Sequence, residues 1–340
     1  MAMRKKRNLL VILAVIILVV VIVLNSFVYL NAQKPYTGNV QSIVYGDLTT
    51  GSSALIYVAQ AQNFFAENGI NFTIQNYASG INTINAAINN QVDIGYATEF
   101  GFLANAVLKN ENLSIIATVD KFDAYFLVAR KDLGITNPSD LNGKSVGVTL
   151  GTISQFYLGQ FLELNGIDAN NVTIVNMPFS QTPEALENGT VDAVVTYSPY
   201  TDQIQAQLTS NVVMWSVQSN QEGYGLIFGS DSWISQNPEL VIRFLKALNQ
   251  AENYLINNPS AAESITQKAL NRTNAEITEL WSQVGWSLSL DQALPLAMQE
   301  EAIWLVNNNL TDATSVPNFL NYIYFNGLES VDPNAVTITH

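Results

Sequence analysis

The stretch NGTVDAVVTYSPY, residues 188–200, has a near copy earlier in the chain, NNQVDIGYATEF at residues 89–100. Each copy follows an Ala-rich run with helical spacing, and each places Val-Asp in front of an apolar run. A polar turn followed by a short apolar run is typical of the strand that closes a β-α-β unit. The duplication therefore predicts two lobes built on one plan. We expect Asp93 and Asp192, one in each copy, to be structural residues paired with turn amides.

The elements around the first copy alternate between strands and helices. In chain order we predict a strand at 42–47, a loop at 48–53, a helix at 54–68 ended by Gly69, a strand at 70–77, a helix at 81–89, a strand at 92–97, a helix at 100–108 and strands at 113–120 and 124–130. This order favours a mostly parallel sheet with helices on both faces.

The same order then starts again around the second copy. We predict a turn and strand at 140–150, a helix at 155–165, a strand at 171–177, a helix with Thr182 as N-cap and Pro183 at its first position, and a strand at 191–197. After two further strands, at 212–217 and 224–230, the pattern is helical, beginning with Asn237 as cap and Pro238. The predicted lobes are residues 42–125 plus 220–340, and residues 128–215.

The N-terminus carries an apolar run at residues 8–30, behind a basic cluster within residues 1–7. At about 1.5 Å per residue, this run can cross a hydrocarbon core of roughly 30 Å. The basic cluster predicts a cytoplasmic N-terminus, a linker at 31–41 and a body outside the cytoplasm. We favour a single-pass anchor in the cell membrane. A signal that is cleaved near Ala32, releasing a secreted body, remains the alternative.

Composition excludes several classes of function. The chain has 340 residues with 14 Lys and Arg against 28 Asp and Glu, which argues against a nucleic-acid partner. There is no Cys, and the one His is His340, so Cys nucleophiles, disulfides, Cys-ligated zinc and His acid–base catalysis are ruled out. No phosphate-binding glycine motif is present. We therefore expect a binding protein without metal or cofactor, and not an enzyme.

Six Asn-x-Ser/Thr sequons fit an exported chain, and their glycosylation is left open at this point. They are Asn71, Asn112, Asn171, Asn188, Asn271 and Asn309.

Five blocks of sequence together resemble one family. They are NFFAENGINFTI (63–74), AAINNQVDIGYATEFGFLANA (86–106), ARKDLGITNPSDLNGKSVGVTLGT (129–152), ALENGTVDAVVTYSPY (185–200) and NPELVIRFLKALNQAENYLINNP (237–259). In this order they resemble the ABC-importer substrate-binding proteins for nitrate, sulfonates, taurine and thiamine-type pyrimidines. The resemblance implies an α/β, two-lobed type II periplasmic-binding-protein fold with a helical C-terminal part, here preceded by one transmembrane helix. It also implies a monomer that delivers a small ligand to an ABC permease and its ATPase.

Ligands of α/β sheets sit beyond the carboxyl ends of the strands. The resemblance places contacts at Ser79, Gly80, Gly151, Thr152, Ser154, Tyr197 and Tyr200, and the facing loop adds Thr98 and Glu99. Thr98 and Glu99 depart from the small residues or Pro that the family pattern favours. No Lys or Arg lies in these loops.

Acidic side chains near these loops suit a ligand with an amine or a ring N–H. Asp47, Glu99, Asp123 and Glu222 are the candidates. A zwitterionic sulfonate or an aminopyrimidine then fits better than nitrate does. A thiamine-type pyrimidine binder and a ligand sensor that reuses the fold are the alternatives. The family's pyrimidine-synthesising branch depends on Cys and His chemistry that this chain lacks.

Overall fold

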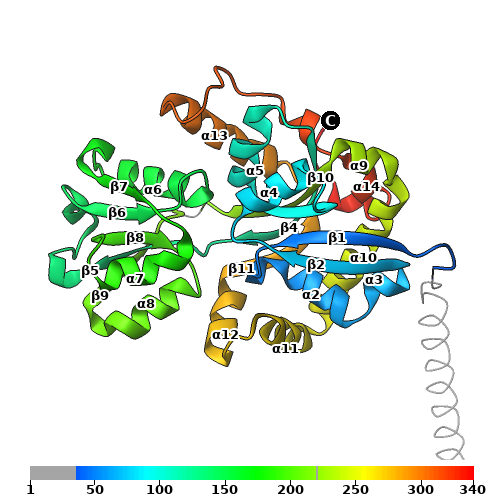
Figure 1. Cartoon of the computed structure of the whole chain (residues 1–340), viewed down its shortest axis with the longest axis horizontal. Coiled ribbons are helices and arrows are strands. Elements are labelled where there is room, and N and C mark those ends of the chain that lie inside the picture. The colour runs from blue at the N-terminus through cyan, green and yellow to red at the C-terminus, as the bar shows by residue number, and fades with distance from the viewer. Residues whose placement is uncertain (1–35, 220) are drawn as a thin grey trace, which may run out of the picture. The chain divides into compact units, whose positions relative to one another are not determined.

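Two mixed β-sheets, each flanked by helices, make up residues 40–340, which form one compact unit (Figure 1). The computed structural model describes residues 36–219 and 221–340. The first sheet has the order β11-β4-β10-β3-β1-β2 and the second β7-β6-β8-β5-β9. We call the first sheet with its helices lobe 1 and the second sheet with its helices lobe 2. The two-lobed α/β prediction is confirmed at this level.

The strands of lobe 1 are β1 (Gln41–Asp47), β2 (Ile70–Asn76), β3 (Ile94–Thr98), β4 (Leu113–Phe122), β10 (Gly223–Ser230) and β11 (Val284–Ser289). Those of lobe 2 are β5 (Phe126–Arg130), β6 (Ser145–Val148), β7 (Thr173–Asn176), β8 (Ala193–Thr196) and β9 (Val212–Ser216).

The helices of lobe 1 include α2 (Ala54–Ala61), α3 (Phe64–Glu67), α4 (Gly80–Ile88), α5 (Glu99–Asn105), α9 (Asp231–Gln236), α10 (Pro238–Asn257), α11 (Pro259–Leu270), α12 (Asn274–Gln283), α13 (Ala293–Asn307) and α14 (Phe325–Glu329). Lobe 2 contains α6 (Ile153–Leu164), α7 (Thr182–Glu187) and α8 (Tyr200–Leu208).

Neither sheet is mostly parallel, so that prediction is wrong. In lobe 1, β1 runs parallel to β2 and β3, whereas β10 is antiparallel to β3 and β4. In lobe 2, β6 is parallel to β7 and β8, whereas β5 is antiparallel to β8 and β9. The antiparallel strands β5 and β10 are those by which the chain enters lobe 2 and returns to lobe 1. Two such crossings, rather than one continuous β-α-β series, produce the mixed sheets.

The two copies of Val-Asp hold equivalent strands together. Asp93 accepts a hydrogen bond from the Val44 N–H at 2.8 Å, and its own N–H donates to the Val44 carbonyl at 2.9 Å. Asp192 does the same with Ser145, at 2.8 and 3.0 Å. Both Asp are therefore structural, as predicted. The amide that each carboxylate binds lies on the neighbouring strand, β1 or β6, and not in the turn.

Three local predictions need correction. The helix expected at 54–68 is broken between α2 and α3, where Asn63 adopts a left-handed conformation with φ of 62°. The helix α7 begins at Thr182 with Gln181 as its N-cap, because the Thr182 hydroxyl instead donates to the Phe179 carbonyl at 2.7 Å. A strand, β11, follows α12 where only helices were expected.

The predicted basic cluster at 1–7 and the apolar span at 8–30 lie outside the described residues, as do residues 31–35 of the predicted linker at 31–41. Across residues 36–219 and 221–340, no helix has both the length and the apolar character needed to span a bilayer.

A buried glutamine joins the two crossings between the lobes. The outgoing crossing runs from β4 to β5, and the return crossing runs from β9 to β10. Gln218, on the return crossing, is 1% exposed. Its Oε1 accepts from the N–H groups of Ala124 and Tyr125 at 2.7 and 3.0 Å. Its Nε2 donates to the carbonyl of Phe122 at 2.9 Å and to the Tyr157 hydroxyl at 3.0 Å. One side chain thus fixes the outgoing crossing, the return crossing and α6 of lobe 2 at the hinge.

Candidate functional site

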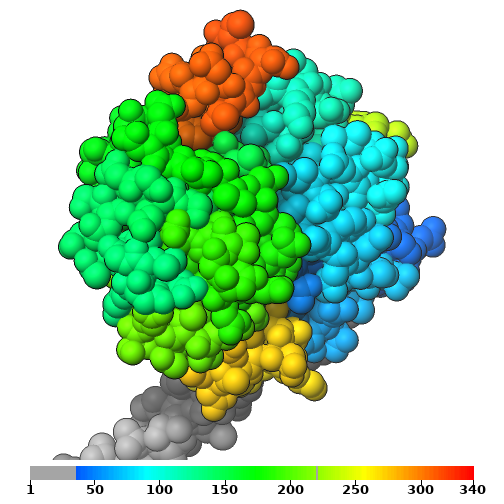
Figure 2. All heavy atoms as spheres, turned by 60° about the vertical axis from the view of Figure 1, so that its left-hand side comes forward, coloured from blue at the N-terminus to red at the C-terminus, as the bar shows by residue number. Residues whose placement is uncertain are grey.

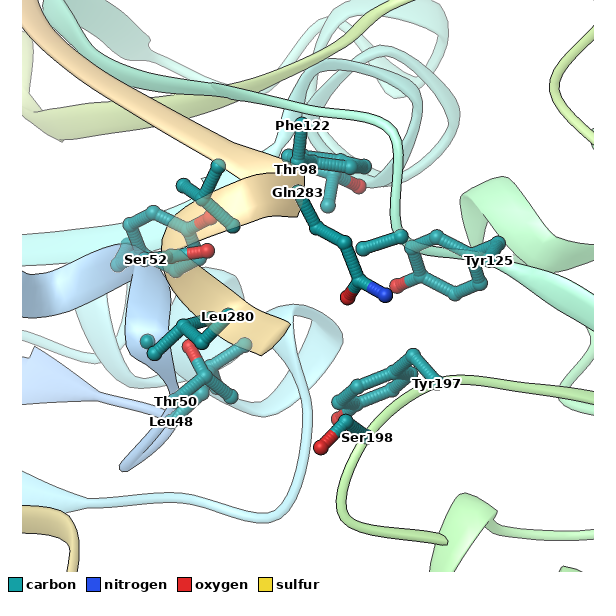
Figure 3. A pocket seen from close by; sticks show the side chains of 14 residues that line it. Leu48, Thr50, Ser52, Thr98, Phe122, Tyr125, Tyr197, Ser198, Leu280 and Gln283 are labelled. Carbon is teal, nitrogen blue, oxygen red and sulfur yellow. The ribbon is translucent and has the colours of Figure 1, made fainter. Parts of the chain in front are cut away.

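Two adjacent cavities lie between the lobes, with volumes of about 70 and 40 Å³. They share Leu48, Thr98, Tyr125 and Tyr197 (Figure 3). The first is also lined by Thr50, Gly51, Ser52, Tyr96, Phe122, Ala124, Ser198, Leu280, Gln283 and Val284. The second is also lined by Ala78, Ser79, Gly80, Ile81, Gly101, Thr152, Ile153 and Phe179. Lobe 1, lobe 2 and the outgoing crossing all contribute, so the cavities depend on how the lobes meet.

Helix N-termini bring polar groups to the second cavity. Ser79 caps α4 by accepting from the Asn82 N–H at 3.4 Å, and Thr98 caps α5 by accepting from the Gly101 N–H at 3.2 Å. From lobe 2, Thr152 is the N-cap residue of α6. Gly80 permits close packing of α4 on β3, since a Cβ there would lie 3.0 Å from the Cβ of Ala97. Free N–H groups at such helix starts favour a ligand that carries negative charge.

Aromatic side chains form much of the wall on the lobe 2 side. The Tyr125 ring lies 5.2 Å from Tyr197 and 5.8 Å from Phe122, and Tyr197 lies 4.9 Å from Phe179. Burial raises the pKa of both tyrosines well above the ordinary value, so both remain neutral phenols. Figure 3 shows Gln283 reaching from α12 into the space between Leu280 and Tyr125. The wall can therefore stack on a flat or apolar group and still offer O–H and amide donors.

Carboxyl groups lie buried behind the lobe 1 wall. Asp120 is fully buried and accepts from the hydroxyl of the cavity residue Tyr96 at 3.2 Å. Its burial raises the pKa of Asp120 to about 7. Asp47, also fully buried, accepts from Ser53 and, at 2.7 Å, from Tyr57. None of the ion pairs among the described residues involves these carboxyls.

Hydrogen bonds across the cleft hold the lobes closed at both ends. The Asn105 side chain of lobe 1 donates to the carbonyl of Gly151 in lobe 2 at 3.2 Å. Arg272, between α11 and α12, donates through Nη1 to the Ser198 hydroxyl at 3.2 Å, and Ser198 donates to Asp202 at 2.6 Å. In Figure 2 the two lobes meet along a seam, with the orange atoms of the α13 region at one end and yellow atoms at the other.

The structure brings five of the nine predicted site residues to the cavities: Ser79, Gly80, Thr98, Thr152 and Tyr197. Glu99 is 1% exposed and packs inside lobe 1. Ser154 is fully buried and shares a 2.7 Å hydrogen bond with Thr152. Gly151 contacts lobe 1 through Asn105, and Tyr200 packs on Tyr197 at 5.6 Å between ring centroids. Each of these four is the chain neighbour of a cavity residue or contacts one.

Sequence reasoning missed the contributions of the crossing and of the C-terminal helices. Tyr125 lies on the outgoing crossing, between β4 and β5. Leu280 and Gln283 lie at the end of α12, and Arg272 precedes that helix. None of these residues belongs to a strand-end motif. A search of the C-terminal helices of lobe 1 for side chains that reach the cleft could have found Leu280 and Gln283, whereas no sequence signal marks Tyr125.

Comparison with known proteins identifies the relatives of this chain. The family model described as "NMT1/THI5 like" matches residues 51–262. A putative binding protein, YtlA, of Bacillus subtilis (strain 168) is 24% identical over 218 residues, which cover 63% of this chain and 65% of YtlA. The taurine-binding periplasmic protein of Escherichia coli (strain K12) is 27% identical over 210 residues, 59% of this chain and 63% of that protein. The chain thus spans somewhat less than two thirds of these curated relatives.

A solved structure gives the same fold at low identity. The alkanesulfonate-binding protein SsuA from Xanthomonas axonopodis pv. citri, bound to MOPS, aligns with a TM-score of 0.72 at 16% identity. The alignment covers 85% of this chain and 99% of that protein. This likeness establishes the two-sheet binding-protein fold for residues on both sides of the cleft.

One relative is named as an enzyme. The 4-amino-5-hydroxymethyl-2-methylpyrimidine phosphate synthase of Aspergillus parasiticus is 24% identical over 232 residues, 62% of this chain and 64% of that protein. In this chain the sole histidine, His340, contacts Phe325, Glu329 and Ile338, and none of these residues lines either cavity.

Proposed function

Because the chain belongs to the NMT1/THI5-like family, we propose that it is an extracytoplasmic solute-binding protein that delivers a small polar ligand to an ABC importer. Two relatives support this role by name, the E. coli taurine-binding protein and the Xanthomonas alkanesulfonate-binding protein. The observation that carries the proposal is the pair of cavities lined jointly by both lobes and the outgoing crossing. A ligand held there has contacts with both lobes only in the closed form, so binding favours closure. The closed form is then the one a permease recognises.

The ligand that fits best carries an anionic head group of the sulfonate, taurine or nitrate class. The starts of α4, α5 and α6 meet at the second cavity, and Ser79, Thr98 and Thr152 supply hydroxyls there. Arg272 adds a positive charge beside the first cavity through Ser198. Backbone N–H groups, hydroxyls and one guanidinium suit a tetrahedral or planar oxyanion of small size.

A thiamine-type pyrimidine is the second candidate, and the aromatic wall favours it. Tyr125, Tyr197 and Phe179 lie within 6.2 Å of one another by ring centroids. Such a wall stacks on a planar ring, and the amide of Gln283 can pair with ring nitrogen atoms. The synthase relative points in the same direction, although we propose binding without catalysis because the cavities contain neither Cys nor His.

A thermal-shift screen of the fragment starting at Tyr36 separates these candidates. The panel contains taurine, alkanesulfonates, nitrate, bicarbonate and aminopyrimidines. We expect one of the first three to raise the melting temperature, since bound ligand stabilises the folded state by mass action. Stabilisation by aminopyrimidines alone would select the second candidate, and no response to any compound would remove the solute-binding proposal.

Substitution of Tyr197 tests the position of the site. Tyr197 lines both cavities, so Tyr197→Phe removes one hydroxyl at the centre of the cleft and keeps the ring. We expect the ligand found in the screen to bind about 5–10-fold more weakly, as for the loss of one hydrogen bond. The matched control is Tyr254→Phe, on α10, where affinity should not change. Unchanged affinity in Tyr197→Phe would place the ligand elsewhere.

Attachment to the membrane and assembly complete the proposal. We propose that the apolar run at 8–30, which lies outside the described residues, anchors a monomer whose body is outside the cytoplasm. N-terminal sequencing of the native protein tests the anchor, because a chain that begins near Gln33 has lost it. A sensor role for the same body is distinguished by the absence of permease and ATPase genes beside its gene.

A further inference from the structure

Two of the six sequons occupy equivalent positions in the two lobes. In lobe 1, Thr73 of Asn71-Phe72-Thr73 pairs with Val44 on β1, and in lobe 2, Thr173 of Asn171-Val172-Thr173 pairs with Ser145 on β6. Val44 and Ser145 are the two residues whose amides the structural aspartates bind. Asn71 and Asn171 therefore sit at the same place of the same fold, at the start of β2 and just before β7.

Both sequons present their reacting groups to solvent. All six sequon asparagines are exposed. The Asn71 amide makes one exposed contact, to the Ser42 hydroxyl at 3.2 Å, and the Asn171 amide makes one, to Asn142 at 3.4 Å.

The sequon hydroxyls separate these two sites from the other four. Within the described residues, no hydrogen bond involves the hydroxyl of Thr73 or Thr173, so both remain available to a transferase that reads the Asn-x-Thr motif. In the other four sequons the hydroxyl is engaged: Ser114 with Asp231, Thr190 with Asn188, Thr273 with Glu276 and Thr311 with the Ala313 amide.

The strands at these two sites lie at sheet edges and lack the charged residues and Pro that usually block pairing with another chain. β2 and β7 are each the last strand of their sheet, next to β1 and β6. Neither strand contains Lys, Arg, Asp, Glu or Pro, and Ile174 on β7 is 41% exposed. An exposed, uncharged edge strand is a template for pairing with another chain, and native proteins block it with charge, Pro or a cover.

We propose that Asn71 and Asn171 carry N-linked glycans that cover the two equivalent edge strands. In the transfer, the Asn Nδ2 attacks the anomeric carbon of a lipid-linked oligosaccharide. The bond from that carbon to phosphate oxygen breaks, the lipid phosphate leaves with the electron pair, and the amide loses one proton to a base of the transferase. The inference rests on export of the body, which is part of the proposed function, and it concerns residues outside the ligand cleft.

Mass spectrometry of the full chain produced in its own host tests the proposal. We expect the peptides containing Asn71 and Asn171 to carry glycan, and Asn71→Gln and Asn171→Gln each to lose the mass of one glycan. Thr73→Ala and Thr173→Ala should lose it too, whereas Thr→Ser should retain it. The matched controls are Asn76→Gln and Asn176→Gln, because these exposed asparagines occupy equivalent places on the same strands and lie outside any sequon. Unmodified peptides at both sites would overturn the proposal.

A second measurement tests the role of the cover. In light scattering, the double variant Asn71→Gln/Asn171→Gln should form oligomers whose size rises with protein concentration. Adding the substitutions Thr73→Lys and Thr173→Lys to this variant should restore the monomer. A double variant that stays monomeric at every concentration would refute edge protection. The ligand response in the thermal-shift screen should persist in the double variant, so failure of this inference is distinguishable from failure of the solute-binding proposal. Cell fractionation that leaves the chain in the cytoplasm would refute both.

Discussion

The two lobes share a strand order and a Val-Asp pairing, yet they place charge differently. In lobe 1, Asp47, Glu99, Asp120 and Glu301 are all at most 1% exposed. In lobe 2, which the structure describes in full over residues 126–216, the buried polar side chains are all hydroxyls: Thr152, Ser154, Thr182, Thr196 and Thr201. One fold thus supports both kinds of interior, and the cleft separates a lobe with buried carboxyls from a lobe whose buried polar side chains are hydroxyls.

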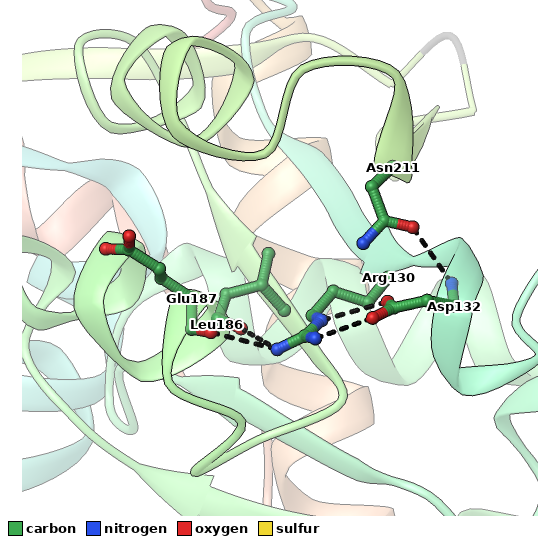
Figure 4. Close-up of polar contacts among 5 residues, drawn as sticks. All are labelled: Arg130, Asp132, Leu186, Glu187 and Asn211. Carbon is green, nitrogen blue, oxygen red and sulfur yellow. Dashed lines mark hydrogen bonds and ion pairs between the residues drawn. The ribbon is translucent and has the colours of Figure 1, made fainter.

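An ion pair of lobe 2, between Arg130 and Asp132, lies at its surface (Figure 4). Arg130 binds Asp132 through two hydrogen bonds, at 3.0 and 2.7 Å, and also donates to the carbonyls of Leu186 and Glu187 at the end of α7. The guanidinium holds the pKa of Asp132 down to about 2. In lobe 1, burial raises the pKa of Asp120 and of Glu99. Burial also raises the pKa of Glu301, and the neighbouring carboxyl of Glu99 raises it further.

These shifts give the lobes opposite dependence on pH. A carboxyl with a raised folded pKa stabilises the fold below its unfolded pKa, and this stability is lost as pH rises through the folded value. Lobe 1 should therefore weaken between about pH 4 and 8. A carboxyl with a lowered pKa stabilises the fold above its unfolded pKa, and this stability is lost as pH falls through the folded value. The contribution of Asp132 in lobe 2 is therefore present above about pH 4 and is lost as pH falls toward 2.

The largest effect is expected where the lobes depend on one residue, Gln218. Gln218→Leu removes the side-chain hydrogen bonds to two amides and to two carbonyls, those of Phe122 and Gln221, at a cost of about 3–5 kcal/mol. Urea unfolding measures the loss, and both lobes should be affected because the hinge is common to them. The control Gln207→Leu, on the exposed face of α8, should stay within about 0.5 kcal/mol of the parent. Equal stability of the two variants would contradict the hinge role.

Removing the aspartate of each lobe compares the equivalent strand pairs directly. Asp192→Ala loses bonds to the Ser145 amide and to the Ser145 hydroxyl, and Asp93→Ala loses bonds to the Val44 amide and to the Trp233 side chain. We expect each change to cost about 1.5–3 kcal/mol, and the two costs to agree within about 1 kcal/mol. Chemical denaturation measures both against Asp312→Ala, an exposed control in lobe 1. Costs that differ by more than this would show that the pairings are not equivalent.

The acidic interior of lobe 1 predicts a measurable pH slope. Between pH 5 and pH 8 the melting temperature should fall by a few °C, because charging the buried carboxyls costs on the order of 1–2 kcal/mol. Asp120→Asn removes one of these groups and should flatten the slope while lowering stability at pH 5. A melting temperature that rises from pH 5 to pH 8 in the parent would contradict the charge assignment of lobe 1.

The sequence predicts what the lobes repeat and misses what joins them. The Val-Asp copies predicted the duplicated units because each unit carries its own turn, helix and apolar strand. The strand β11 was missed because Val284 follows α12 directly, without a Gly or Pro between them. Gln218 and Arg272 act through partners 60 or more positions away, such as Tyr157 and Ser198, and a single polar residue in a loop carries no pattern. Local signals therefore define each lobe, whereas the cleft depends on contacts that only the assembled fold creates.

The smallest expected effect concerns the closing of one lobe upon the other. Glu279 on α12 lies beside Asp202 on α8, and burial, followed by the negative charge of Asp202, raises the pKa of Glu279. The groups that face it are Asp202 from lobe 2 and Gln283, which donates to its Oε1 at 3.0 Å. Asp202 also accepts from Ser198, the partner of Arg272. A protonated Glu279 can donate to Asp202 across the cleft, whereas a charged Glu279 repels it.

Closure should therefore be favoured at low pH and weaken as pH rises through the raised pKa of Glu279. Glu279→Gln keeps a donor without the charge, so the ratio of closed to open molecules should rise about two- to five-fold at pH 8, or about 0.4–1 kcal/mol for this half-exposed pair. Because the chain has no native Cys, labels at Asn76→Cys in lobe 1 and Asn170→Cys in lobe 2 report the distance between the lobes. Glu163→Gln, an exposed change on α6, is the control and should close as the parent does at each pH. If Glu279→Gln retains the pH dependence of the parent, the proton that links the lobes lies on another group, and Asp202→Asn is the next variant to measure.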